Sequence, residues 1–228
     1  MHSLLTVKWR FVETIEADTA QFFESVRDWL MMGAVKFSIS EVMAQPGLIS
    51  TKQGNMPMGP VQHDLAGEPT FEPMIQVDME IKAFVSAWRH CDYVSTYMAR
   101  MISQNRSDSV RHSNLFSSAF NELLEVAFRT RLADGELACR VSRHGATDRI
   151  ELTFPCLPGE RQFYQEALSQ VAAFEAKERY LNSVSGDLAP SREMVLLELA
   201  VDYNATLWVE EADGDAIKLV VDLPLEGQ

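Results

Sequence analysis

The residues best suited to chemistry gather in one short stretch of the chain, between residues 121 and 129. Asn121, Glu122, Glu125 and Arg129 recur at steps of three and four, a spacing that places side chains on the same side of a helix. Amide and carboxylate oxygens brought together in a cleft suit a hard cation such as Mg²⁺. A core helix with a solvated polar face shows the same pattern, so the spacing leaves both interpretations open.

A helix over residues 109–131 is predicted to position these polar side chains. Its apolar residues also recur at steps of three and four, which predicts a wide stripe facing the core. The stripe consists of Phe116, Ala119, Phe120, Leu123, Leu124 and Ala127. The polar residues are therefore expected on the opposite side of the same helix.

The second half of the chain predicts helices and strands in an order typical of an α+β protein. Strands are predicted over residues 75–81, 135–142, 149–154, 205–210 and 216–223, and helices over 84–101, 109–131, 160–181 and 191–203. Ser191 can cap the last helix, and Asp213-Gly214-Asp215 predicts a tight turn between the last two strands. We therefore predict a two-layer α+β sandwich, with helices on one face of a mixed, mostly antiparallel sheet.

Residues 1–73 are predicted to lie outside this domain. Residues 1–43 predict an α/β extension with strands over 5–13 and 35–42 and a helix over 18–32. Residues 44–73 hold five of the nine prolines and several glycines, which is typical of a linker or a lid. The predicted division is thus 1–43, 44–73 and 74–228.

The overall composition narrows the classes of partner. The formal net charge is −13 over 228 residues, which repels phosphate backbones and anionic lipids and argues against nucleic acid and membranes as partners. No apolar run approaches the roughly 20 residues that span a bilayer, and the N-terminus lacks a signal-peptide pattern, so we expect a cytoplasmic protein. The three cysteines and five histidines do not fall at zinc-ligand spacing, so no metal site is predicted.

The seven residues from Asn121 to Ala127 match six residues of the motif Asn-Glu-Leu-Leu-Glu-Asn-Ala. This stretch resembles the N-box of the histidine-kinase-like ATPase (GHKL, or Bergerat) superfamily, and most of all its small bacterial SiaB-type regulators, relatives of the anti-sigma-factor kinases. Residues 196–208 resemble the late helix and following strand of that branch, and residues 88–101 resemble the helix ahead of the N-box. The resemblance covers residues 74–228 and implies the same α+β fold.

The resemblance also implies roles for particular residues. Glu122 stands at the position of the general base, which makes it the candidate catalytic residue. Asn121, Glu125 and Arg129 are the candidate nucleotide-binding residues around it. In the active relatives these side chains would serve ATP and Mg²⁺.

This sequence departs from the ATP-binding motifs of the superfamily at three places. Val126 stands where the family has the Asn that coordinates Mg²⁺, and it has no ligand atom. Residues 155–160 replace the Asp-x-Gly-x-Gly loop that binds adenine, and residues 185–192 lack a Gly-x-Gly pattern for phosphate. The resemblance therefore implies a retained fold with a degenerate ATP site, and no cofactor is predicted.

Three functions remain open from the sequence. The first is a non-catalytic signalling regulator that binds a partner protein, one that carries a STAS-type or phosphatase domain. The second is an active Mg-ATP-dependent serine/threonine kinase of such a partner, with Glu122 as base and Asn121 or Glu125 as substitute metal ligands. The third is an oligomeric scaffold or small-ligand-binding module, for which a homodimer is the simplest form.

Overall fold

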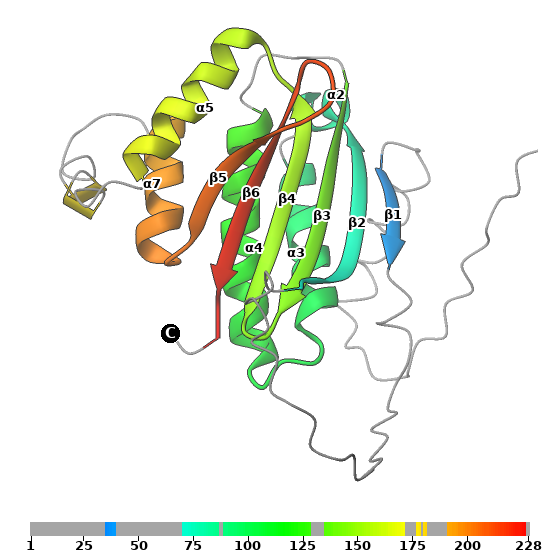
Figure 1. Cartoon of the computed structure of the whole chain (residues 1–228). Coiled ribbons are helices and arrows are strands. Elements are labelled where there is room, and N and C mark those ends of the chain that lie inside the picture. Colours follow the sequence, from blue (N-terminus) through cyan, green and yellow to red (C-terminus); the bar gives the residue numbers. More distant parts are fainter. Residues whose placement is uncertain are drawn as a thin grey trace, which may run out of the picture.

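Six β-strands form one sheet, and every pairing between neighbouring described strands is antiparallel. The computed structural model describes residues 35–39, 70–86, 89–128, 135–171, 177–178, 180–181 and 191–226. The strands are β1 (Val35–Ile39), β2 (Glu72–Glu80), β3 (Glu136–His144), β4 (Thr147–Pro155), β5 (Thr206–Glu211) and β6 (Ala216–Pro224). Across the sheet they lie in the order β1-β2-β3-β4-β6-β5 (Figure 1).

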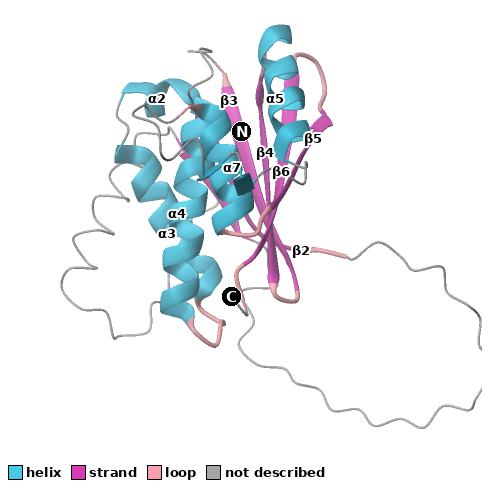
Figure 2. Cartoon of the chain, turned by 90° about the vertical axis from the view of Figure 1, so that its left-hand side faces the viewer, coloured by secondary structure: helices cyan, strands magenta, loops and turns pink. Residues whose placement is uncertain are grey.

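Helices form the second layer of the molecule. They are α2 (Ile81–Ser86), α3 (Arg89–Ser103), α4 (Ser109–Phe128), α5 (Pro158–Val171) and α7 (Arg192–Asp202). Figure 2 shows α3, α4 and α7 on one side of the sheet, and α5 packs against α7 and β5. The predicted two-layer α+β sandwich is therefore confirmed.

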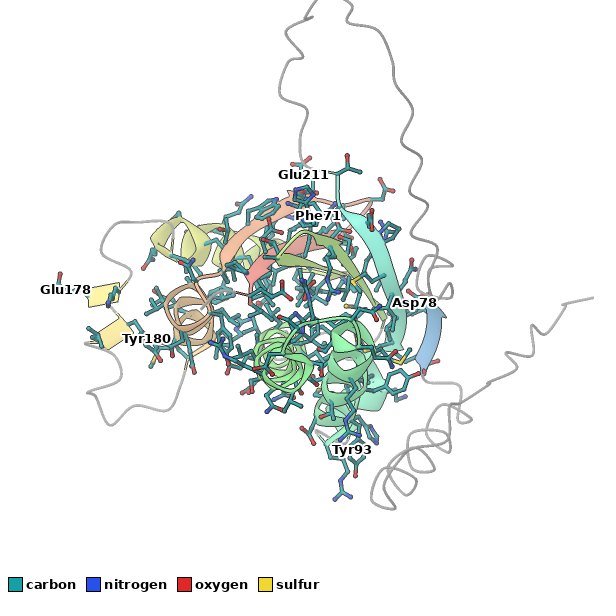
Figure 3. The ribbon with its side chains drawn as sticks, turned by 90° about the horizontal axis from the view of Figure 1, so that it is seen from below. Phe71, Asp78, Tyr93, Glu178, Tyr180 and Glu211 are labelled. Atoms are coloured by element: carbon teal, nitrogen blue, oxygen red, sulfur yellow. The ribbon has the colours of Figure 1, made fainter. Side chains whose placement is uncertain are left out.

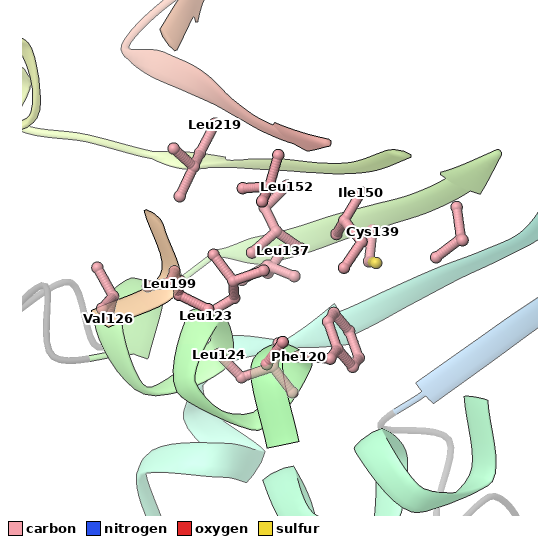
Figure 4. Packing of buried hydrophobic residues seen from close by; sticks show 14 of the residues in the cluster. Phe120, Leu123, Leu124, Val126, Leu137, Cys139, Ile150, Leu152, Leu199 and Leu219 are labelled. Carbon is pink, nitrogen blue, oxygen red and sulfur yellow. The ribbon is translucent and has the colours of Figure 1, made fainter. Parts of the chain in front are cut away.

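The core lies between α4 and the sheet (Figure 4). Every residue of the predicted apolar stripe of α4 is buried, and Leu123 and Leu124 are completely enclosed. They share one buried cluster with Leu137, Ile150 and Leu152 of the central strands. Because burial of one such side chain contributes about 1.5–3 kcal/mol, the stripe determines which side of α4 faces inward.

Two glycines with positive φ close the hairpins of the sheet. Gly145 has φ 56° and Gly214 has φ 68°, values that suit glycine in tight turns. The Asp-Gly turn before β6 lies where the sequence predicts it. The predicted loop over residues 144–148 is too long, because His144 pairs with Thr147 and leaves a two-residue turn.

The helix predicted over residues 84–101 is divided into α2 and α3 in the structure. The Ile81 N–H donates to the Gly135 carbonyl over 3.1 Å, so the chain passes from β2 directly into α2. Residues 87–88 lie outside the described residues. The helix predicted over 160–181 begins at Pro158 and is described as α5 as far as Val171.

The predicted cap of α7 is confirmed. The Ser191 hydroxyl accepts a hydrogen bond from the Met194 N–H over 3.2 Å, which satisfies one of the free donors at the start of the helix. The cap fixes where α7 begins and so sets which of its side chains lie beside α4.

The strand predicted near residue 35 is present as β1, and it pairs with β2. A strand from the predicted N-terminal extension is therefore part of the same sheet as the predicted 74–228 domain. The other elements predicted within residues 1–32 and the linker over 44–69 lie outside the described residues. No helix in the described part of the chain has the length and apolar character needed to cross a membrane.

Candidate functional site

Two acceptor oxygens on the polar side of α4 are shielded from solvent and lack a donor. They are Oδ1 of Asn121 and Oε2 of Glu122, and both side chains are half-buried. Neither atom has a hydrogen-bond partner among the described residues. Because an unsatisfied buried acceptor costs about 1–3 kcal/mol, this side of α4 is a candidate binding site.

Helix α7 adds two carboxylates to the site. Glu198 and Asp202 lie four positions apart and so share one side of α7, and α7 packs against α4. Burial, followed by the negative charges of Glu198, Glu125 and Asp202, raises the pKa of Glu122 to about 7. Glu122 therefore exchanges its proton near neutral pH.

Two tyrosines border the same carboxylates. Tyr180 Oη donates to Asp202 Oδ2 over 2.9 Å, and Figure 3 shows this side chain beside α7. Burial and the hydrogen bond to Asp202 raise the pKa of Tyr180 to about 12. Burial and the charge of Glu122 raise the pKa of Tyr203, the C-cap residue of α7, to about 12. We call Glu122, Glu198, Asp202, Tyr180 and Tyr203 the α4–α7 acidic face.

Val126, at the position of the family's Mg²⁺ ligand, lies in the core. It is 0 % exposed, and its carbonyl accepts a hydrogen bond from Tyr164 Oη over 3.2 Å. An isopropyl side chain offers a hard cation no oxygen. Within the described residues, no group of three or more His, Cys, Asp or Glu side chains could hold a metal ion. The residues present therefore do not fit Mg²⁺, and the nearby carboxylates would repel a triphosphate.

The structure brings together some of the predicted site residues and adds others. Asn121, Glu122 and Glu125 lie on the outward side of α4, as the spacing predicts. Arg129 lies outside the described residues. The additional members come from α7 and from Tyr180, which are distant in sequence. The four-residue step from Glu198 to Asp202 was a signal that these two side chains share one helix face.

A second cluster of chemistry-bearing side chains joins the start of α4 to the β3–β4 hairpin. Ser103 Oγ lies 2.7 Å from His112 Nδ1, and His112 Nε2 lies 2.8 Å from Asp148 Oδ2. Arg143 Nε donates to Asp148 Oδ1 over 2.6 Å, and Arg106 Nη2 donates to the same oxygen over 3.2 Å. Burial opposes ionisation of Asp148, but the hydrogen bonds from His112 and Arg143 hold its pKa below the usual value.

This Ser-His-Asp chain of contacts resembles the arrangement that activates a serine nucleophile. Ser103 is 1 % exposed, however, and Asp148 is 0 % exposed. The cavity beside His112 is lined by residues such as Asp108 and Leu225 and does not reach Ser103. The cluster is therefore closed to substrate, and it holds α3, α4 and the hairpin together.

The sheet face that points away from the helices carries a stacked arginine. Arg149 binds Asp222 through two hydrogen bonds of 2.7 and 2.9 Å. Its guanidinium lies 3.7 Å from the ring centroid of Phe71 and 5.1 Å from that of Trp208. Here a carboxylate and aromatic rings together hold one arginine.

Comparisons with protein-family models, with curated proteins and with solved structures found no match to this chain. The relationship to histidine-kinase-like ATPases remains a prediction from the sequence motifs. Function is therefore inferred from the side chains of the two clusters, and the α4–α7 acidic face is the one that solvent reaches.

Proposed function

We propose that this chain is a signalling regulator that acts by binding a partner protein. On this proposal its frame is that of the histidine-kinase-like ATPases, and its nucleotide site is degenerate. The observation that carries the proposal is the complete burial of Val126, at the position where the resembled proteins bind Mg²⁺. Without a cation, the charge that develops during phosphoryl transfer has nothing to neutralise it.

The charges around Glu122 also support binding without catalysis. Glu198, Glu125 and Asp202 all act on Glu122 as like charges, and a nucleotide would bring further negative charge to the same place. A protein surface with basic groups would relieve this repulsion instead.

The kinase alternative requires Asn121 or Glu125 to replace the missing Mg²⁺ ligand. Both lie on α4 beside Glu122, but no group of metal-binding side chains is present there among the described residues. Glu125 also differs from position 126 by about 100° around the helix axis, given ~3.6 residues per turn. The observed geometry therefore gives this alternative no support.

The resemblance supplies the kind of partner that we propose. It is a regulatory protein with a STAS-type or phosphatase domain, and the encounter takes place in the cytoplasm. A homodimer of the chain remains a separate prediction.

Calorimetric titration of the full chain with ATP, with and without Mg²⁺, tests the proposed function. We expect no Mg²⁺-dependent heat at ATP concentrations up to the millimolar range. The same preparation is then titrated with the STAS-type and phosphatase-domain proteins of its own genome, one of which is expected to bind. Micromolar affinity for ATP that depends on Mg²⁺, followed by phosphate transfer to such a protein, would establish the kinase instead.

A further inference from the structure

We propose that the α4–α7 acidic face docks an arginine-bearing segment of the partner protein. This inference rests on the proposed function and adds the chemistry of the partner at that site. The segment would place guanidinium groups beside Glu122, Glu198 and Asp202, and it would supply hydrogen-bond donors to α4.

The first argument is charge complementarity. No Lys or Arg among the described residues lies within ion-pairing distance of Glu122, Glu198 or Asp202. Other carboxylates of the fold do have such partners: Asp148, Glu151, Glu160, Glu210, Asp222 and Glu226 each contact Arg or Lys. The acidic face therefore differs from the other acidic positions of the described chain, because cations compensate those positions and not this one.

The second argument concerns hydrogen bonding. Asn121 Oδ1 and Glu122 Oε2 are shielded from solvent, and no donor reaches them within the described chain. Both atoms are acceptors only. A guanidinium presents five N–H donors in a rigid fork, so it can satisfy a carboxylate and a neighbouring amide oxygen together.

The third argument is that the fold already binds its own arginines with the same combination of groups. Arg192 donates to Glu160 Oε2 over 2.5 Å while its guanidinium lies 4.2 Å from the ring centroid of Phe163. Arg149 is held in the same way between Asp222 and two aromatic rings. The acidic face also combines carboxylates with aromatic side chains, those of Tyr180 and Tyr203, but holds no arginine from the described residues.

The same geometry argues against a metal ion as the occupant. A single divalent cation needs its oxygen ligands within about 2.0–2.6 Å, and the described carboxylates contain no group that could converge in this way. Carboxylates spread over two helices instead suit a segment that offers several separate cationic groups.

A labelled peptide of alternating arginine and alanine, with four arginines, tests this inference. Its dissociation constant for the full chain is measured by fluorescence anisotropy at 150 mM salt. The double variant Glu198→Gln/Asp202→Asn removes two charges from the face and is expected to weaken binding about tenfold. Both substitutions keep hydrogen-bonding side chains, and thermal unfolding verifies that the fold is retained.

A second double variant, Glu72→Gln/Asp213→Asn, is the matched control. It removes the same two charges from exposed positions on β2 and in the β5–β6 turn, and we expect it to change affinity less than about twofold. Equal weakening by both double variants would overturn the inference, because it would mean that only net charge matters. So would a wild-type chain that does not bind the peptide.

The two proposals fail in different ways. Tight Mg²⁺-dependent ATP binding would remove the proposed function itself. If ATP does not bind, a partner protein does, and Glu198→Gln/Asp202→Asn leaves that affinity unchanged, only the docking inference fails.

Discussion

Val126 separates this chain from an ATP-binding relative by a single side chain, but the surroundings of that residue have changed as well. It is fully enclosed in the core between α4 and the sheet. A side chain pointing into a hydrophobic cluster cannot also reach a phosphate in solvent.

Restoring the motif with Val126→Asn is therefore expected to damage the fold without restoring ATP binding. The amide would be buried without a planned partner, which costs about 1–3 kcal/mol in the free energy of unfolding. Urea unfolding measures this loss. The control is Glu125→Asn, which places the same residue one position earlier on the outward side and should cost less than about 1 kcal/mol. Mg²⁺-dependent ATP binding by Val126→Asn would contradict the assignment of this position to the core.

Glu122 makes stability depend on pH near neutrality. Its pKa is raised from 4.5 to about 7 in the folded chain, so between these values the folded state binds more protons than the unfolded state. Stability therefore falls as pH rises from about 4.5 to 7, by about 1–2 kcal/mol once solvent screening is allowed for. We expect Glu122→Gln to flatten this part of the pH profile.

The measurement is urea unfolding at several pH values between 4.5 and 8. Asp213→Asn, in the exposed turn before β6, serves as the control and should leave the shape of the profile as in the wild type. An unchanged profile for Glu122→Gln would show that Glu122 is solvated in the folded chain.

At the scale of elements, α4 is held at both ends by different interactions. Near its start, His112 belongs to the buried cluster around Asp148. Near its end, Tyr164 of α5 binds the Val126 carbonyl. The polar residues of α4 are thus presented on a helix that cannot rotate without breaking these contacts.

Asp148→Asn is expected to lower the free energy of unfolding by about 3–5 kcal/mol, because it leaves buried cationic groups without their counter-charge. The folded chain holds the pKa of Asp148 below 3.8, so this stabilisation is present above that value and is lost as pH falls below it. Urea unfolding at pH 7 tests the magnitude. Asp222→Asn removes a partly exposed partner of Arg149 and should cost only about 1 kcal/mol. Similar losses for the two variants would contradict a dominant role for the buried cluster.

For the whole molecule, the net charge of −13 acts against compactness. Raising the salt concentration from about 0.05 M to 0.5 M shortens the screening length from roughly 14 Å to 4 Å, which weakens repulsion between the carboxylates. We expect the melting temperature to rise with salt, and to rise less in Glu198→Gln/Asp202→Asn than in the wild type. A falling melting temperature would mean that the ion pairs of the open sheet face outweigh the acidic repulsion.

The sequence by itself determined the elements of the second half and the inward side of α4. Its apolar steps and turn residues act locally: the 3.6-residue period selects the stripe around Leu123, Ser191 caps its own helix, and Gly214 permits its own turn. Loop lengths and helix ends were less accurate, since backbone contacts such as Ile81 to Gly135 decide them.

Only the tertiary structure decided which side chains share a site. Glu122 and Asp202 are far apart in the chain, and they influence each other because α7 packs against α4. Ser103, His112 and Asp148 likewise meet only where the α3–α4 connection reaches the β3–β4 hairpin. Electrostatic interaction depends on distance in space and on burial, and neither quantity can be read from the order of residues alone.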